Sequence, residues 1–589
     1  MPTPFNNGPV ENQQYVAYLD LSGGRNTKRD PHALDRNQLV VSDNTWIAQG
    51  NTIAKRPGNI SIAISAGSFG AISAGGVGSG VGAKAMVEGR FYDVTALVVQ
   101  GANSQLYGAP LAVPAISVGL VAKWVSIGAI SGGTIAAAQL FDPDKTNPNG
   151  PDGSLFIVDG VDTPKYWNGP GNVLTPCVPA QLPQKTGVAA PITPKYVATL
   201  FSSLFYAGEP TDPNAVYVSN PFNPQQFTIN IIAPTPSTTT NSYIPLYAGR
   251  GDGINGGYIT GLAPLGQSMI IYKESSIYYM YNVSLTGQML WATAVGSASV
   301  GMTAPKSLVP FDTFHVFLGI DGVYTFDGTN TKKISENNPD LFDGPAALIA
   351  NRTTAVGVRY GDRYLIWFDS GVGYPNTGAW FDFGRLDVDG YPCCGTVSAM
   401  NVGGIAPLRG PQDTGNFAWA DAVVDRVGVF NALANSYVAS SDFGSAITTS
   451  VSGKADFFAD VWSDEGMVDQ KSIDSAQLLM SFPIVAANQS YTFNATVFYD
   501  QLTSTLSLVN SYALPTPGVA LVGTAVVGTA VVSIASVAAA YQILPLYQPS
   551  PATGTILQFT WTESSVWPWT ALGYTLLVNR QRRTGTASG

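Results

Sequence analysis

Residues Phe314–Gly328 read FHVFLGIDGVYTFDG, two runs of aromatic and β-branched residues that meet at Asp321-Gly322. Residues of these types favour the half-buried, pleated surface of a strand. An Asp-Gly pair between two such runs indicates a β-hairpin, because glycine reaches a positive φ at the turn without a steric penalty. The stretch therefore predicts one antiparallel strand pair.

The same strand–turn–strand module recurs along the chain. Its copies lie at Phe91–Gly108, Gly153–Gly169, Tyr196–Gly208, Tyr258–Tyr281, Phe314–Gly328, Tyr360–Asp369 and Val427–Asp442. Successive copies are roughly 40–65 residues apart, the repeat length of a four-stranded propeller blade with long loops. Such a sheet cannot bury both faces alone, and stacking several around an axis gives them a common core. We predict an all-β fold: an irregular six- or seven-bladed β-propeller with long loop insertions and a β-rich C-terminal extension. A β-sandwich with many inserted loops is the alternative.

Changes in sequence texture divide the chain into three parts. We predict an N-terminal arm with the first strands over residues 1–58, a propeller body over residues 59–443, and a closing blade with the C-terminal extension over residues 444–589. In the last part, Tyr491–Tyr499 (YTFNATVFY) alternates apolar and polar residues, as a half-exposed strand does.

The composition is that of a β protein with few charges. Of 589 residues 12% are charged and 45% apolar, and 63 are glycine and 40 proline, too apolar for disorder and too rich in helix breakers for a helical chain. Lys and Arg (29) are outnumbered by Asp and Glu (39), so the net charge is −10. Proteins that grip nucleic acid need clustered cations, because released counterions supply much of that affinity. We therefore expect no specific nucleic-acid binding; a surface that DNA slides past without sticking fits the same numbers, but composition does not show it.

The cysteines and the apolar segments bear on where the chain folds. Cys177, Cys393 and Cys394 offer no disulfide framework, which fits assembly in a reducing cytoplasm. The opening Met1–Asn6 lacks the basic start and apolar core of a signal peptide. Val519–Ala540 is long enough to span a membrane, but its interspersed Gly, Thr and Ser favour a β-hairpin or loop packed in an oligomer. We predict no stable membrane insertion.

Residues with catalytic or metal-binding chemistry are few. The two histidines, His32 and His315, have no cysteines at zinc spacing, and His315 is interpreted as an ordinary strand residue. Asp142–Gly153 has oxygen ligands at alternating positions that would suit Ca²⁺, but it lacks the glycine and the closing glutamate of an EF-hand loop. Nothing singles out a pair of glycosidase carboxylates. We predict no enzymatic activity, no cofactor, and no catalytic, cofactor-binding or metal-binding residues.

Five stretches, in order, resemble one family. They are Leu21–Gly58 (LSGGRNTKRDPHALDRNQLVVSDNTWIAQGNTIAKRPG), Val158–Gly169 (VDGVDTPKYWNG), Leu204–Phe227 (LFYAGEPTDPNAVYVSNPFNPQQF), Gly257–Met280 (GYITGLAPLGQSMIIYKESSIYYM) and Gly301–Gly328. Together they resemble the β-propeller tail nozzle or tail-hub structural proteins of short-tailed bacteriophages. The resemblance covers roughly residues 15–385, and the first stretch is its most specific part. The uncharged Val519–Ala540 segment departs from the family's pattern.

The resemblance implies a structural virion protein of the phage tail, assembled in the host cytoplasm, with no catalytic residues to carry over. Its expected state is a homo-oligomeric ring, usually a hexamer. The ring would lie beneath the portal–adaptor assembly, contact tail fibre or needle proteins, and form part of the DNA-ejection channel. The alternative is a glycan-binding propeller that recognises a receptor at the tail tip, suggested by 27 Tyr and 11 Trp residues suited to sugar stacking. A polysaccharide-degrading enzyme would rest on fold analogy alone.

Overall fold

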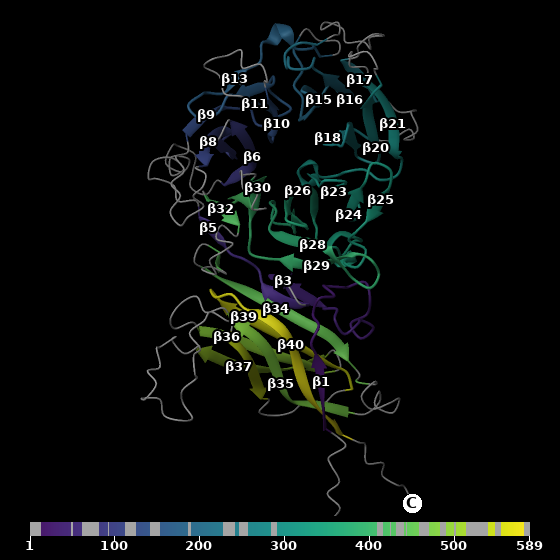
Figure 1. Ribbon diagram of the computed structural model, residues 1–589, viewed down its shortest axis with the longest axis vertical. Helices are drawn as coiled ribbons and strands as arrows, with labels where there is room; N and C mark the ends of the chain where they lie inside the picture. Colours follow the sequence, from purple (N-terminus) through teal and green to yellow (C-terminus); the bar gives the residue numbers. More distant parts are fainter. Residues whose placement is uncertain are drawn as a thin grey trace, which may run out of the picture. The chain divides into compact units, whose positions relative to one another are not determined.

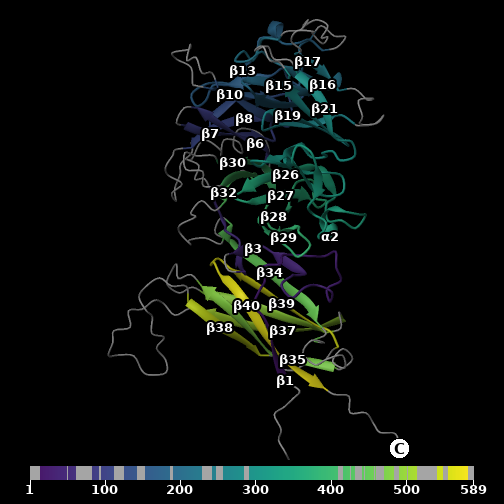
Figure 2. The same cartoon turned by 45° about the vertical axis from the view of Figure 1, so that its right-hand side comes forward.

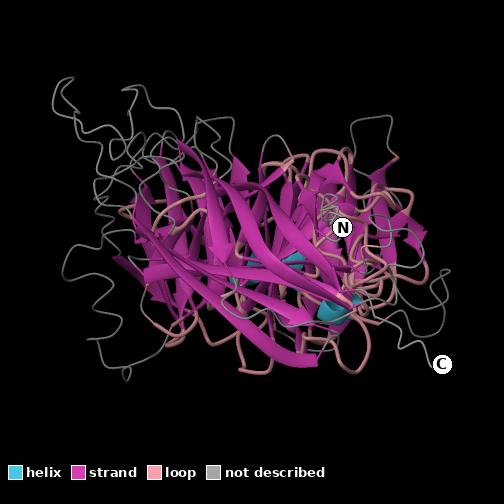
Figure 3. Cartoon of the chain, turned by 90° about the horizontal axis from the view of Figure 1, so that it is seen from below, coloured by secondary structure: helices cyan, strands magenta, loops and turns pink. Residues whose placement is uncertain are grey.

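The computed structural model describes residues 13–581. It leaves gaps at 49–50, 62–81, 92–93, 112–124, 142–152, 186–189, 228–241, 247–256, 284–290, 409–415, 425, 431–440, 443–444, 457, 459–469, 483–489, 500–501, 514–539 and 548–554. Strands make up most of the described regular structure, with a few short helical turns, among them α2 (Pro339–Phe342) (Figure 3). The prediction of an all-β chain is confirmed.

The chain forms two compact units, each built from separate segments. The propeller unit contains residues 60–380 and 399–432, and the sandwich unit contains residues 1–59, 381–398 and 433–589. The boundary at 59/60 lies one residue from the predicted boundary at 58/59.

The propeller unit contains five four-stranded antiparallel sheets in chain order. Their strands are β6 (Ala83–Phe91), β7 (Val94–Gly101), β8 (Gln105–Leu111) and β9 (Val125–Ala129); β10 (Ala136–Phe141), β11 (Gly153–Val158), β12 (Lys165–Trp167) and β13 (Thr175–Pro176); β14 (Tyr196–Leu200), β15 (Ser203–Glu209), β16 (Asp212–Val218) and β17 (Tyr243–Pro245); β18 (Ile259–Leu265), β19 (Ser268–Lys273), β20 (Ile277–Asn282) and β21 (Trp291–Ser297); and β22 (Val309–Pro310), β23 (His315–Leu318), β24 (Val323–Phe326) and β25 (Thr331–Lys333).

Two further sheets complete the unit. One contains β26 (Asn351–Tyr360), β27 (Arg363–Asp369) and β28 (Thr377–Leu386), and β28 continues past residue 380 into the segment assigned to the other unit. The other contains β30 (Val402–Pro407), β31 (Phe417–Asp421) and β32 (Val427–Phe430). Figure 1 shows the sheets following one another around a ring, from β6, β8 and β9 through β15–β17 and β23–β25 to β30 and β32, and Figure 2 shows the same sheets from another side.

The ring closes because neighbouring sheets share their cores. The first strands contact one another in a closed series: β6, β10, β14, β18, β22, β26, β30 and back to β6. At the closing seam, Leu97 and Val99 of the first sheet pack in one buried cluster with Ala406, Ala418 and Ala420 of the last. Stacked sheets that bury each other's faces around an axis form a β-propeller, so the predicted fold class is confirmed.

The sandwich unit contains the remaining strands. They are β1 (Gln13–Tyr18), β2 (Val41–Asp43), β3 (Thr45–Ala48), β4 (Thr52–Lys55), β29 (Pro392–Val397), β33 (Ser441–Asp442), β34 (Ser445–Asp456), β35 (Gln470–Phe482), β36 (Ser490–Tyr499), β37 (Leu502–Ala513), β38 (Ala540–Tyr547), β39 (Leu557–Ser565) and β40 (Thr570–Gln581). One sheet has the order β3-β4-β40-β35-β38, with β1 on β40, and in the other β39 pairs with β34 and β36.

Both sheets of the sandwich unit bury one face in a single core. The core includes Leu478 and Met480 of β35 from one sheet and Phe493, Phe559 and Trp561 from the other. Along β36 every second residue from position 491 to 497 is buried, so the alternation predicted for Tyr491–Tyr499 is confirmed. This unit is the β-rich C-terminal extension, completed by N-terminal strands.

The predicted hairpin turns differ in their backbone. Gly160 and Gly328 have positive φ values of 78° and 95°, as Asp-Gly turns favour, but Gly322 does not have a positive φ. The expectation for Gly322 was wrong, because β23 and β24 are joined by a four-residue loop in which the Gly319 N–H donates to the Gly322 carbonyl. A Cβ at this position would lie 2.4 Å from Ser335 Oγ, so a larger residue would have to displace that side chain.

Two predicted features fall outside the described residues. They are the Val519–Ala540 stretch over residues 519–539 and the oxygen-rich Asp142–Gly153 loop over residues 142–152. Within the described part of the chain, the helices are too short or too polar to cross a membrane.

Candidate functional sites

The end of the stretch Leu21–Gly58 builds a buried ionic contact in the sandwich unit. Lys55 Nζ lies 2.9 Å from Glu563 Oε2, and both side chains are fully buried. Trp569 Nε1 donates to the same oxygen at 2.8 Å. Burial lowers the pKa of Lys55, and the nearby Glu563 carboxylate opposes this shift. Loss of either partner would leave a buried charge unpaired, and a pair so enclosed by core residues offers no access to a substrate.

Arg56 extends this contact into a polar network of the same unit. Its guanidinium forms a forked pair with the Asp442 carboxylate, and its Nε donates to Asn44 Oδ1 at 2.7 Å. The Asn44 amide in turn donates to Ser398 Oγ at 2.7 Å and to the Thr448 carbonyl at 2.8 Å. A planar fork that meets a carboxylate in this way fixes orientation as well as distance. The network therefore holds three distant chain segments in register.

The paired glycines of the same stretch are explained by close packing. A Cβ on Gly23 would lie 2.7 Å from the Asn37 carbonyl oxygen. Gly24 has φ +69°, and a Cβ there would lie 2.9 Å from the backbone nitrogen of Cys394. Together with the Lys55 and Arg56 contacts, this gives the residues that carry the resemblance a structural role inside the sandwich unit.

On the propeller, turns between the second and third strands repeat one device. Asp369 Oδ1 accepts three turn N–H groups at 2.7–3.0 Å, and Asp159 and Asp421 each accept two in the same way. These buried carboxylates hold turns that expose valines: Val161 (54%), Val372 (51%) and Val424 (43%). Because all first strands lie innermost and strands alternate in direction, these turns leave the same end of their sheets. The three valines therefore lie on one face of the propeller.

A lysine links two propeller sheets that are not adjacent. Lys306, in the 3₁₀ turn η2 (Pro305–Ser307) before the fifth sheet, donates from Nζ to the Lys84 carbonyl on β6 of the first sheet. Those two sheets are not neighbours in the ring, so the contact runs across the space that the first strands enclose. Burial lowers the pKa of Lys306 to about 8. This hydrogen bond therefore links two sheets that lie across the ring from each other.

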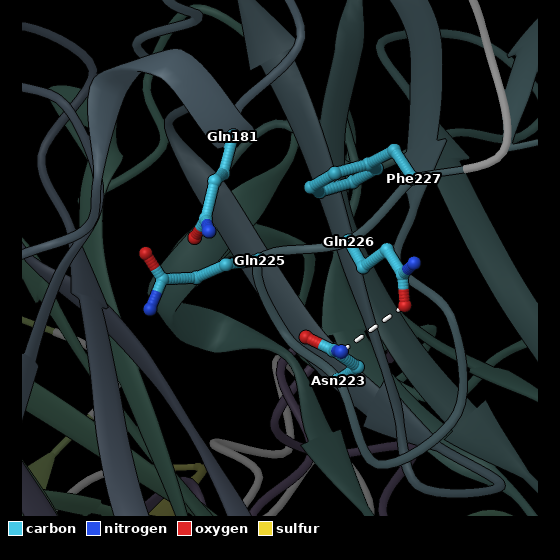
Figure 4. A pocket seen from close by; sticks show the side chains of 5 residues that line it. All are labelled: Gln181, Asn223, Gln225, Gln226 and Phe227. Atoms are coloured by element: carbon cyan, nitrogen blue, oxygen red, sulfur yellow. Dashed lines mark hydrogen bonds between the residues drawn. The ribbon is translucent and has the colours of Figure 1, made fainter.

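A polar hollow of about 290 Å³ lies beside the third sheet (Figure 4). It is lined by Gln181, Asn223, Gln225, Gln226 and Phe227. Asn223 Nδ2 donates to Gln226 Oε1 at 3.1 Å, and Gln225 Oε1 accepts the Val178 N–H at 2.6 Å. Gln181 comes from the connection between the second and third sheets, and the other lining residues come from the loop after β16. The lining residues carry no ionisable side chain.

Three non-glycine residues near this loop adopt left-handed backbone conformations. Phe201 (φ 49°) and Ser202 (φ 58°) form the two-residue turn between β14 and β15, and Phe222 (φ 58°) donates its N–H to the Ser202 carbonyl. Phe201 is 41% and Phe222 is 55% exposed. The Phe201 ring stacks on Trp291 with centroids 6.3 Å apart. Such a conformation is uncommon for bulky side chains and persists where its surroundings impose it.

The two histidines belong to different units, and of the two only His315 is buried. His315 is buried, paired with Tyr272 Oη at 2.9 Å and with the Pro264 carbonyl at 3.0 Å, and burial lowers its pKa to about 4. His32 belongs to the sandwich unit and lies 2.7 Å from Asp30. The expectation of a satisfied strand histidine at position 315 is thus confirmed.

The Cys177 and Cys393 thiols lie in surroundings that disfavour the reactive thiolate. The three cysteines are buried and unbridged, and burial raises the pKa of the Cys177 and Cys393 thiols to about 12. Across the described residues, His, Cys, Asp and Glu side chains form no group of three that could hold a metal ion.

Sequence reasoning did not single out the hollow or the exposed phenylalanines. Their segment was quoted only as part of Leu204–Phe227, and its signal is the run Asn220-Pro-Phe-Asn-Pro-Gln-Gln-Phe227. Two prolines within that run predict a turn, but they do not indicate which side chains it exposes.

No protein-family model and no curated protein matches the chain. Among solved structures, Raptor from Chaetomium thermophilum aligns with 11% identity and a TM-score of 0.35 over 60% of this chain and 28% of its own. BBS1N, in complex with ARL6DN, aligns with 9% identity and a TM-score of 0.36 over 60% of this chain and 94% of its own. PorZ, a surface component of the type-IX secretion system of Porphyromonas gingivalis, aligns with 14% identity and a TM-score of 0.30 over 59% and 36%. Likenesses this weak do not indicate a function.

Proposed function

We propose that this protein is a structural subunit of a bacteriophage tail, a nozzle or hub ring that forms part of the DNA-ejection channel and attaches to the portal–adaptor assembly. One observation carries the proposal. The stretch Leu21–Gly58 resembles the family, and its residues Lys55 and Arg56 form buried polar contacts inside the sandwich unit. Family-typical residues with a structural role inside the protein support a function that depends on shape and assembly.

The Lys306 contact between two propeller sheets supports a channel built from several copies. The hydrogen bond from Lys306 to the Lys84 carbonyl links the first and fifth sheets of one subunit, which favours a DNA channel formed between subunits over one through a single propeller. A channel then requires a ring of subunits, for which the family resemblance implies sixfold symmetry. A net charge of −10 fits such a lumen, since each phosphate contact would have to be broken during ejection.

Cryo-electron microscopy of the purified full-length protein, alone and with detergent-released tail complexes, tests this proposal. We expect a closed ring of about six copies with a pore wider than duplex DNA, and antibody labelling of the tail of intact virions. Particles that remain monomeric under both conditions, together with labelling absent from virions, would refute it.

DNA binding gives a second, independent readout. We expect no retention on duplex DNA at 150 mM salt and a weak dependence of binding on salt concentration. Tight binding with a steep salt dependence would show several lysine and arginine contacts to phosphate, which contradicts a channel through which DNA slides.

A further inference from the structure

We propose that the rim of the third propeller sheet binds a neutral carbohydrate, with Phe201 and Phe222 as the aromatic platform and the amides of the adjoining hollow as the hydroxyl-recognising groups. The turn Phe201–Ser202 and the loop Asn220–Phe227 form this rim, and the Phe222 N–H joins them through the Ser202 carbonyl at 2.8 Å. The proposal does not depend on a role in a phage tail.

The backbone of these two segments is the first argument. A two-residue hairpin turn with positive φ at both positions favours Asn and Gly, yet here it contains Phe and Ser. Each left-handed non-glycine residue costs on the order of 1 kcal/mol. Phe222 also has a positive φ, and the residue is 55% exposed, so burial of its side chain contributes little to folding stability. A ligand that covers the Phe222 ring would bury this apolar surface.

The chemistry of the hollow is the second argument. An amide side chain donates and accepts hydrogen bonds at once, which matches sugar hydroxyl groups that do the same. Four of the five lining residues are Asn or Gln, and the amide of Gln181 is exposed toward Gln225 (Figure 4). Aromatic rings pack against the C–H faces of sugar rings. The Phe201 ring stacks on Trp291, which is 4% exposed, and this contact holds the ring in place for such packing.

The absence of charge in the lining selects the class of sugar. None of its five residues is ionisable, so an acidic saccharide brought here would lose hydration of its carboxylate without gaining a cation. The hollow's volume, about 290 Å³, is at the lower end of small-molecule pockets and suits one sugar unit, with neighbouring units lying over the exposed rings. A neutral oligosaccharide therefore fits better than an acidic one.

The test is a glycan array of neutral and acidic bacterial oligosaccharides probed with the full-length protein, followed by calorimetric titration of the strongest neutral binder. Phe222→Ala should weaken binding about tenfold, because it removes the stacking surface, and Phe222→Trp should restore it. Gln226→Leu should weaken binding through lost hydrogen bonds. Tyr258→Ala is the matched control. It removes an aromatic side chain that is 58% exposed and directly precedes the fourth sheet, and it should leave the affinity unchanged.

Each outcome decides the matter. Binding of neutral glycans that falls with Phe222→Ala and Gln226→Leu but not with Tyr258→Ala supports the site. Binding confined to acidic glycans, equal loss in all three variants, or an array with no binder overturns it. Capture of uncharged peptides in place of sugars by a parallel peptide array would also overturn it, since amides recognise peptide groups as well.

Discussion

His315 shows how a single buried base links stability to pH. Its ring is fully buried between Tyr272 and the Pro264 carbonyl, and burial lowers its pKa to about 4. In the unfolded chain a histidine titrates near 6.5, so on acidification the unfolded state takes up this proton first. The stability contributed by the neutral ring is present above pH 6.5 and is lost as the pH falls toward 4.

We therefore predict that this one group costs the propeller about 3 kcal/mol of stability between pH 7 and pH 4. His315→Gln keeps a hydrogen-bonding side chain but cannot titrate. It should therefore flatten the dependence of stability on pH between pH 7 and pH 4, although carboxyl groups still titrate in that range. Urea unfolding of both proteins at half-unit pH steps measures the difference in slope. Parallel profiles for the two proteins would contradict this role of His315.

Lys55 gives a prediction about a buried pair. Lys55→Met leaves the Glu563 carboxylate unpaired among core residues, which should destabilise the sandwich unit by about 3–5 kcal/mol. Lys55→Met with Glu563→Leu removes both charges and should recover most of that loss, because neither partner then remains buried alone. Thermal unfolding of the single and double variants provides the comparison. A double variant no more stable than Lys55→Met would show that the pair contributes more than the cost of its desolvation.

At the scale of the element, the carboxylate-capped turns give a matched pair of sites. Asp369 is 3% exposed and accepts three turn N–H groups, whereas the exposed Asp327 accepts two in a turn of similar form. Asp369→Ala removes three hydrogen bonds made by a buried carboxylate, so we expect a loss of about 2 kcal/mol. Asp327→Ala leaves donors that water reaches, and the loss should stay below about 1 kcal/mol. Equal losses in chemical denaturation would mean that burial does not set the strength of these caps.

Single elements could be predicted where local pattern decides the structure. The strand at Tyr491–Tyr499 followed from its alternation, and each of the seven recurring modules contributes strands to a different propeller sheet. The make-up of the sandwich unit could not be predicted this way. β34 pairs with both β2 and β39, about 400 and 100 residues away, and a strand's own sequence carries no sign of such distant partners. The hollow beside the third sheet escaped prediction for the same reason, because separate loops meet there.

At the scale of the whole propeller, closure depends on the seam between the last and first sheets. Strand β5 (Asn59–Ser61), which precedes the first sheet, is the neighbour of β32 in the last, so segments from both ends of the unit's sequence complete one sheet. Within the seam, small alanines at positions 406, 418 and 420 pack against Leu97 and Val99. Small side chains let the two sheets approach closely, and this makes the seam sensitive to added volume or charge.

Ala418→Glu tests that seam. Ala418 is fully buried, so a carboxylate there would be buried without a partner and should destabilise the closed ring by more than about 3 kcal/mol. Hydrogen exchange should rise on both sides of the seam, in β6–β7 and in β30–β31, while β18–β21 on the far side of the ring keep their protection. Ala346→Glu, at an exposed position, is the control and should leave exchange unchanged. The prediction is wrong if exchange rises only around position 418 and β6–β7 stay protected. The first sheet would then keep its structure without the last, and contacts other than this seam would close the ring.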